Sequence, residues 1–284
     1  MAHHLNDKIN DDWVVAREVI SQEFLKGFDL NPTKALRLSD ELKILEIILP
    51  EVKALQKCEQ SPPYHNEGSV YNHALLGLES IQSERFKKYF PNSIKLITKL
   101  GILFHDIGKP KCATKSSDGS IHFNKHDIVG AEIVQKICSR LQLGASSYYP
   151  FKCKQLSWLV KNHLFSIHYK NKPTSPLKLE ELFFSKTYPS KSLLPVMLAD
   201  QLATIVSEGI DQTEPFIILY KALKKLAPKG TLPDPLLSGD DVIRLCDIKP
   251  GPEIKKKLNS VREKQLRGEI KTKKEAKQLL KYAS

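Results

Sequence analysis

The sequence lacks any run of about 18 consecutive apolar residues, the length that a transmembrane helix needs. Its N-terminus is polar, so we expect neither a membrane-spanning helix nor a signal peptide. Cysteine is sparse, because the five cysteines are scattered and form no Cys-x-x-Cys pair. An odd, scattered set is not typical of a disulfide framework, so we predict reduced thiols in a cytoplasmic protein.

What the chain does contain is enough apolar material for a large core. Of its 284 residues, 41% are hydrophobic and 27% are charged, which predicts a globular protein of one large domain or one and a half. The net charge of +12 is uneven, because residues 249–284 hold 12 Lys or Arg against four Glu. This C-terminal segment is therefore a candidate for binding a polyanion. A solvated helical face with pairs such as Lys271 and Glu275 is an equally good interpretation.

Hydrophobic periodicity predicts helices along almost the whole chain. The expected helices cover residues 69–81, 94–108, 127–141, 151–163, 191–207 and 215–226, followed by three basic helices. Asp118-Gly119 predicts a small hairpin or long loop between residues 111 and 125. The Pro/Gly-rich stretch 228–235 is the best domain boundary, so we predict segments at 1–60, 61–227 and 228–284.

One pair of residues carries most of the chemical information. His105 and Asp106 end the apolar run 94–104 and are followed by Ile-Gly-Lys-Pro. A nearly all-apolar helix is buried on every side, so a carboxylate there needs a partner. Imidazole and carboxylate side by side suit a metal ion better than a hydrophobic core. A simple capped helix end is the alternative.

Other polar residues also interrupt apolar stretches, and they complete a possible ligand set. The predicted metal ligands are His73, His105, Asp106, His126, His163 and Asp200. Nitrogen and oxygen ligands without thiolate favour Zn, Mn, Fe, Co or Ni. His126 and His163 would hold a second ion bridged by Asp106, or would instead bond only substrate or water. His73 and Asp200 could also be core residues satisfied by hydrogen bonds.

Two further residues are predicted to contact substrate. Lys109 is expected in the loop after the helix, where its ammonium would bind a phosphate oxygen, although a surface lysine is the default in a chain this basic. His65 is expected at the rim of the site. His122 and His168 are predicted to be surface residues.

The order His73, His105-Asp106, Asp200 resembles the HD-domain phosphohydrolase superfamily. More specifically, the chain is similar to the HD-containing body of the bacterial tRNA nucleotidyltransferase and poly(A) polymerase family. The stretches that carry this resemblance are residues 48–52, 64–73, 103–110, 123–131, 236–241, 249–253, 262–268 and 272–276. They occur in the family order between about residue 15 and the C-terminus, which makes the match specific.

The resemblance implies an all-α fold, an HD-domain helical bundle with a small basic helical C-terminal arm. Residues 1–60 would be a neck-like segment, 61–227 the HD domain and 228–284 an RNA-interacting arm. It also implies His73, His105, Asp106 and Asp200 as metal ligands. His126 and His163 resemble the additional ligands of dinuclear members, which include nucleotide hydrolases and di-iron oxygenases. Members that add nucleotides carry an N-terminal head with Gly-Ser and Asp-x-Asp motifs. The sequence shows neither motif before the region of resemblance, so we expect that it does not polymerise nucleotides alone.

We therefore predict a metal-dependent phosphohydrolase acting on a nucleotide or on a terminal or 2',3'-cyclic phosphate of RNA, with one or two divalent ions. Asp106, Lys109 and His126 are the predicted catalytic residues, and Lys109 and His65 the predicted substrate contacts. One alternative is an RNA-binding body, with tRNA as a candidate ligand, that partners a separate nucleotidyltransferase head. Another is a di-iron oxygenase.

Overall fold

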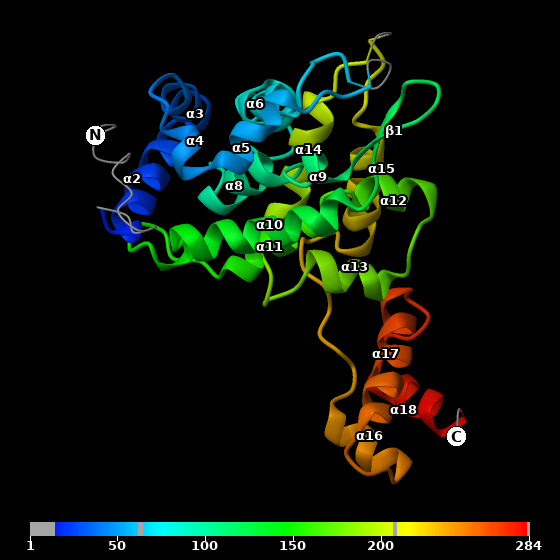
Figure 1. The fold of residues 1–284 in the computed structure, drawn as a ribbon. Helices are drawn as coiled ribbons and strands as arrows, with labels where there is room; N and C mark the ends of the chain where they lie inside the picture. Colours follow the sequence, from blue (N-terminus) through cyan, green and yellow to red (C-terminus); the bar gives the residue numbers. More distant parts are fainter. Residues whose placement is uncertain (1–14, 62–64, 207–208, 283–284) are drawn as a thin grey trace. The chain divides into compact units, whose positions relative to one another are not determined.

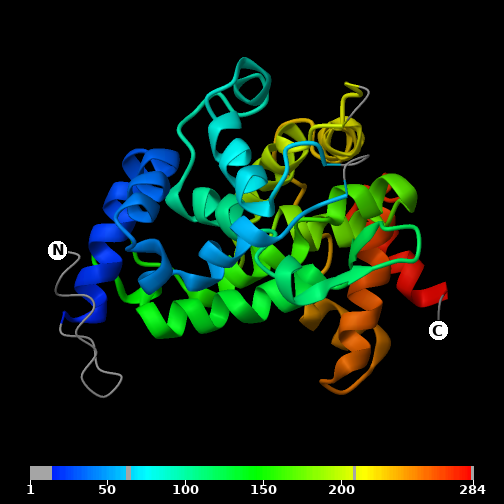
Figure 2. The same ribbon diagram turned by 45° about the horizontal axis from the view of Figure 1, so that its top comes forward.

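The computed structural model describes residues 15–61, 65–206 and 209–282, and Figures 1 and 2 show its fold in two views. Within these ranges the chain is helical apart from one two-stranded sheet, which confirms the predicted all-α class. No helix in the described ranges is both long and apolar enough to cross a membrane.

Contacts divide the chain into two compact units. Unit 1 comprises Met1–Ile167 and Lys191–Ile217, and unit 2 comprises His168–Ser190 and Ile218–Ser284. These units differ from the three segments predicted from sequence, because residues 168–190 group with the C-terminal part of the chain. The three segments stay a prediction.

Unit 1 contains most of the secondary structure. Its elements are α2 (Arg17–Leu30), α3 (Pro32–Glu41), α4 (Leu45–Ile48), α5 (Pro50–Ala54), η1 (Leu55–Lys57), α6 (Val70–Ser80), α7 (Glu84–Lys87), α8 (Leu96–Phe104), α9 (Lys109–Cys112), β1 (Ala113–Lys115), β2 (Ile121–Phe123), α10 (His126–Leu141), η2 (Leu143–Ala145), α11 (Cys153–Asn162) and α14 (Ser190–Ala203). Two further helices, α12 (Phe165–Asn171) and α15 (Glu214–Leu226), cross the division between the units, and the first residue of α14, Ser190, belongs to unit 2.

Helix α8 is the centre of unit 1. All of its residues except Lys99 are buried, as the all-apolar sequence predicts. It packs against α6 and α11, while α10 and α11 lie side by side in both views (Figures 1 and 2). The end of α8 therefore lies in the interior of the unit, where a charged side chain needs a partner within the protein.

Glycines let these helices approach closely at one level of the bundle. A Cβ added to Gly101 on α8 would lie 2.9 Å from Val196 of α14 and 3.2 Å from Leu159 of α11. His105, Asp200 and His163 each follow one of these three residues by four positions, which is about one helical turn. The same close packing therefore places the three polar residues near one another, about one turn further along their helices.

The predicted hairpin is present between α9 and α10. Strands β1 and β2 pair antiparallel, with Thr114 opposite His122. The hairpin is tied to the segment before α6, because the backbone N–H of Ile121 donates to the Ser61 hydroxyl at 2.7 Å. His122 is exposed, as predicted, and so is His168.

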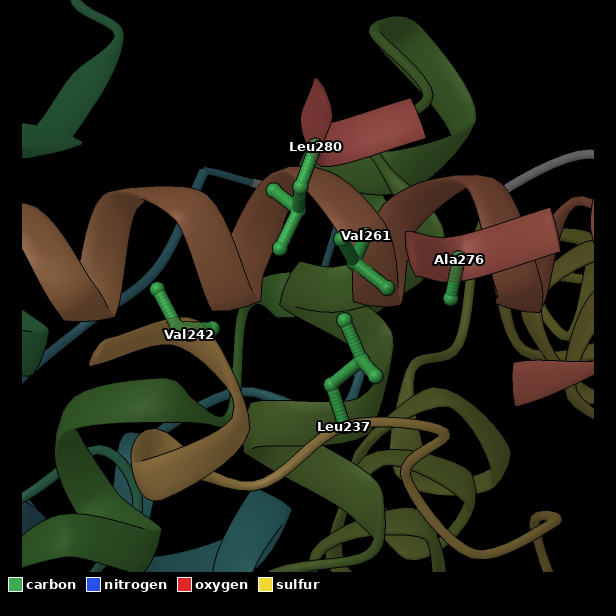
Figure 3. Close-up of a cluster of buried hydrophobic side chains, with 5 residues drawn as sticks. All are labelled: Leu237, Val242, Val261, Ala276 and Leu280. Atoms are coloured by element: carbon green, nitrogen blue, oxygen red, sulfur yellow. The ribbon is translucent and has the colours of Figure 1, made fainter. Parts of the chain in front are cut away.

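Unit 2 has a small core of its own. Its further elements are α13 (Pro176–Phe183), α16 (Gly239–Cys246), α17 (Pro252–Leu266) and α18 (Lys273–Tyr282). Figure 3 shows the cluster of Leu237, Val242, Val261, Ala276 and Leu280, which are all buried. Helices α16, α17 and α18 are thus folded around an apolar centre, and α17 and α18 expose many of their lysines. The prediction of three basic helices is wrong for α16, which holds two aspartates, one arginine and no lysine.

A candidate metal centre

His105 and Asp106 lie immediately after the last turn of α8, and both are buried. The Nδ1 of His105 lies 2.7 Å from the carbonyl oxygen of Ile102, in that last turn. Carbonyls in the last turn of a helix lack intrahelical partners, so this one is free to accept the imidazole N–H. In the neutral imidazole, the proton on Nδ1 leaves the Nε2 of His105 with a lone pair. That Nε2 makes no hydrogen bond with any described residue, although it is buried.

The carboxylate of Asp106 is the meeting point of the cluster. Its Oδ2 lies 2.7 Å from Nζ of Lys109 and 3.3 Å from Nε2 of His105. Its Oδ1 lies 3.1 Å from Nε2 of His126 and 3.7 Å from Nε2 of His163. Nε2 of His73 is the most distant of these groups, at 3.9 Å from Oδ2. One carboxylate therefore faces four imidazoles and one ammonium.

Gly108 explains how His126 comes within reach of Asp106. A Cβ added to Gly108 would lie 2.1 Å from the carbonyl oxygen of His126 and 2.7 Å from the backbone nitrogen of Gly130. Any side chain at this position would push the first turn of α10 away from the turn after α8. Gly108 is thus required because two backbone segments approach closely, and its own backbone angles are not the reason.

His126 and His163 face each other across this part of the cluster. Nδ1 of His126 lies 2.7 Å from the Phe123 carbonyl oxygen, and Nδ1 of His163 lies 2.6 Å from that of Val160. With both Nδ1 atoms protonated, both Nε2 atoms are acceptors, yet they lie only 3.3 Å apart. Two lone pairs in this position need a cation between or beside them, either a proton or a metal ion.

His73 and Asp200 form the other side of the cluster. Nε2 of His73 on α6 lies 3.0 Å from Oδ1 of Asp200 on α14, and the same oxygen is 3.5 Å from Nε2 of His105. The structure thus brings together all six residues predicted as ligands. Potential ligand atoms of His73, His105 and Asp106 lie within 4.8 Å of one another, as do those of Asp106, His126 and His163. Asp106 is common to both groups.

Glu67 and Gln60 were missed by the sequence analysis. Oε1 of the buried Glu67 lies 2.7 Å from Nδ1 of His73 and 2.7 Å from Nδ1 of His65. Gln60 is also buried, and its side-chain carbonyl accepts a hydrogen bond from Lys109. Both residues lie in irregular chain, where no periodicity marks a buried position. His65 is partly exposed beside Glu67, near the predicted rim.

Lys109 does not lie in the expected loop. It is the first residue of the short helix α9, its side chain is only 7% exposed, and its ammonium contacts Asp106 and Gln60. The physical reason is that a buried carboxylate attracts the nearest cation. The ammonium also lies over the ring of Phe123, 5.2 Å from its centroid. The role of Lys109 toward phosphate stays a prediction.

The electrostatics of the cluster favour ionised carboxylates. Burial opposes ionisation, but Lys109 and His105 hold the pKa of Asp106 well below its usual range, and His105 and His73 do the same for Asp200. Burial also opposes protonation of His105, yet the Asp106 and Asp200 charges raise its pKa to about 10. Burial and the charge of His105 lower the pKa of His163 to about 4. The imidazole of His163 is therefore neutral at physiological pH.

The donor set fits a divalent cation. It combines a buried Nε2 without a hydrogen bond, two facing imidazole lone pairs and two ionised carboxylates, and the described residues of the site include no thiolate. Such nitrogen and oxygen ligands suit borderline transition metals. Because Asp106 belongs to both groups of possible ligands, the site is compatible with one ion or with two.

Comparisons with known proteins agree with this geometry. Residues 78–205 match the HD domain family. The chain is 28% identical over 240 residues to the A-adding tRNA nucleotidyltransferase of Deinococcus radiodurans, covering 84% of this chain and 51% of that protein. It is 29% identical over 273 residues to the CC-adding tRNA nucleotidyltransferase of Thermus thermophilus, covering 94% and 57%. It is 32% identical over 144 residues to the Multifunctional CCA protein of Neisseria meningitidis serogroup A, covering 50% and 30%.

The match over residues 78–205 identifies an HD domain in this chain, and the histidine–aspartate cluster is a candidate site for a divalent metal ion. Within that class, the chain is related to the tRNA nucleotidyltransferases, whose alignments cover its HD-containing portion. The chain spans about half the length of the first two curated relatives. The nucleotide-adding activities in these names belong to those longer proteins.

Proposed function

We propose that this chain is a metal-dependent phosphohydrolase that acts on a nucleotide or on a terminal or 2',3'-cyclic phosphate of RNA. The observation that carries the proposal is the convergence of four imidazole Nε2 atoms and one ammonium on the carboxylate of Asp106. A bound divalent ion would supply a Lewis acid for phosphoryl oxygens and a water molecule of lowered pKa. His73, His105, Asp106 and Asp200 would hold one ion, and Asp106, His126 and His163 a second.

The charges of the site support phosphate as the substrate group. Metal ions would replace the histidine protons, so the imidazoles would be neutral. The carboxylates of Glu67, Asp106 and Asp200 and the ammonium of Lys109 then leave two negative charges. One divalent ion neutralises this charge, and a second makes the site positive. An N–H of Lys109 would then bind a phosphate oxygen. If only one ion is bound, His126 would instead accept or donate a proton at Nε2.

Hydrolysis assays with a matched histidine control test the proposal. We expect 2',3'-cyclic AMP, a 3'-phosphorylated oligonucleotide or nucleoside monophosphates to be hydrolysed with added Mn²⁺, Co²⁺ or Ni²⁺. His105→Ala should lower the rate by about 100-fold or more because it removes a ligand. His122→Ala, which changes an exposed histidine on the hairpin, should have no effect. Hydrolysis that survives both chelation and His105→Ala would contradict the proposal.

A second candidate, an RNA-binding body that partners a separate nucleotidyltransferase head, is supported by the exposed lysines of unit 2. Lys255 and Lys256 on α17 are exposed, as are Lys273 and Lys274 on α18. Lysine contacts to phosphates release counterions, so affinity should fall as salt rises. Lys255→Gln with Lys256→Gln should weaken tRNA binding and reduce its salt dependence. Lys34→Gln with Lys136→Gln, two exposed lysines of unit 1, is the control. Equal effects of both pairs, or no tRNA binding at low salt, would argue against this function.

A further inference from the structure

His73 differs from His105 and His163 in its place in the secondary structure. His105 and His163 follow helices α8 and α11, and each Nδ1 reaches a carbonyl in the last turn of its helix. His73 lies inside α6 (Val70–Ser80), where backbone carbonyls are occupied by the helix itself. Its Nδ1 therefore needs a side-chain acceptor.

Glu67 provides that acceptor from outside the helix. Its side chain is fully buried, and Oε1 lies 2.7 Å from Nδ1 of His73. Oε2 accepts the backbone N–H of Ile205 at 3.0 Å, two residues after the end of α14, which carries Asp200. One carboxylate thus contacts His73 directly and holds the chain that follows Asp200.

We propose that Glu67 is a positioning residue for the metal centre, which fixes the Nδ1–H form of His73 so that its Nε2 faces Asp200 as a ligand. This inference rests on the proposed metal-binding function. A carboxylate acceptor on the far nitrogen orients a ligand histidine and makes it a stronger donor than a neutral acceptor does. Because His65 Nδ1 lies 2.7 Å from the same Oε1, Glu67 also orients the predicted substrate contact at the rim.

Cobalt binding to the metal-depleted full chain tests the proposal. Glu67→Gln preserves size but offers only one acceptor oxygen, and its amide can force Nδ1 of His73 to accept. We expect the Co²⁺ affinity of Glu67→Gln to be about 10- to 100-fold below that of the wild type. The affinity of Glu67→Asp should lie between those two values. Glu79→Gln is the matched control, because Glu79 lies on α6 and makes an exposed ion pair with Arg37. Its affinity should equal that of the wild type.

Histidine nitrogen NMR gives a readout that a purely structural role would not move. In Zn²⁺-loaded wild-type protein, the proton of His73 should reside on Nδ1. A proton on Nε2 would overturn the proposal even if Glu67→Gln failed to fold. The proposal would also be overturned if the wild type binds Co²⁺ and a folded Glu67→Gln variant binds it with the same affinity. Failure of the wild type to bind Co²⁺ or Zn²⁺ would instead contradict the proposed function.

Discussion

The contact between Asp106 and Lys109 should dominate the stability of the metal-depleted site. Both side chains are buried, at 3% and 7% exposure, and their charged atoms are 2.7 Å apart. Removing one partner of a buried pair leaves an uncompensated charge, which costs about 3–5 kcal/mol. Asp106→Asn keeps the shape of the side chain but removes its charge, and Lys109→Met removes the ammonium.

A double-mutant cycle measures the interaction directly. We expect Asp106→Asn to lower the free energy of unfolding by about 3 kcal/mol or more, since only uncharged groups such as the Gln60 amide and the Phe123 ring remain beside the ammonium. In the double variant much of this loss should disappear, giving a coupling energy of about 2 kcal/mol. Urea unfolding in chelator, followed by the fluorescence of Trp158 on α11 in a Trp13→Phe background, reports on unit 1.

The matched control is the exposed pair of Glu23 and Lys26. This pair has the same spacing of three residues and a distance of 2.9 Å, but its side chains are 50% and 42% exposed. Its coupling energy should be only about 0.3–0.5 kcal/mol. Additive effects of Asp106→Asn and Lys109→Met, within about 0.5 kcal/mol, would refute the buried-pair argument.

Two further predictions concern the backbone and pH. Gly108→Ala should destabilise unit 1 by about 1–3 kcal/mol or more, because its Cβ would meet α10 backbone, whereas Gly27→Ala in α2 should be neutral or stabilising in the same urea assay. In metal-depleted protein, the pKa of His105 is raised from 6.5 to about 10, so its contribution to stability is complete below pH 6.5 and is lost as pH rises toward 10. The pKa of His163 is lowered to about 4, so its contribution is present above pH 6.5 and is lost as pH falls toward 4. The melting temperature plotted against pH should therefore fall toward pH 10 and toward pH 4. His105→Gln should remove the first slope and His163→Gln the second. Slopes that persist in these variants would contradict the assignments.

Much of the fold and the cluster could be predicted because strong local patterns carry them. The apolar run before His105 fixes a buried helix, and polar residues inside apolar helices must satisfy one another. This reasoning gathered His73 and Asp200 in one site, although they are 127 positions apart. Their role as ligands stays a prediction of the sequence and of the geometry.

The rest could not be predicted because it depends on packing between distant or irregular segments. Glu67 lies before α6 in chain without periodicity, and the only local signal is its position two residues after His65. The requirement for Gly108 arises from the backbone of α10, which the sequence does not specify locally. The grouping of residues 168–190 with the C-terminal unit likewise depends on tertiary contacts.

Metal analysis of the purified full chain tests the central claim most directly. Protein prepared without added metal should contain one or two transition-metal ions per chain, and Asp106→Ala should contain almost none, because Asp106 is common to both ligand groups. The ion's identity would also separate the hydrolase from the di-iron oxygenase alternative, which requires about two iron atoms and oxygen consumption. A wild-type chain without metal that also fails to bind Mn²⁺, Co²⁺ or Zn²⁺, or equal metal content in the variant, would contradict the account.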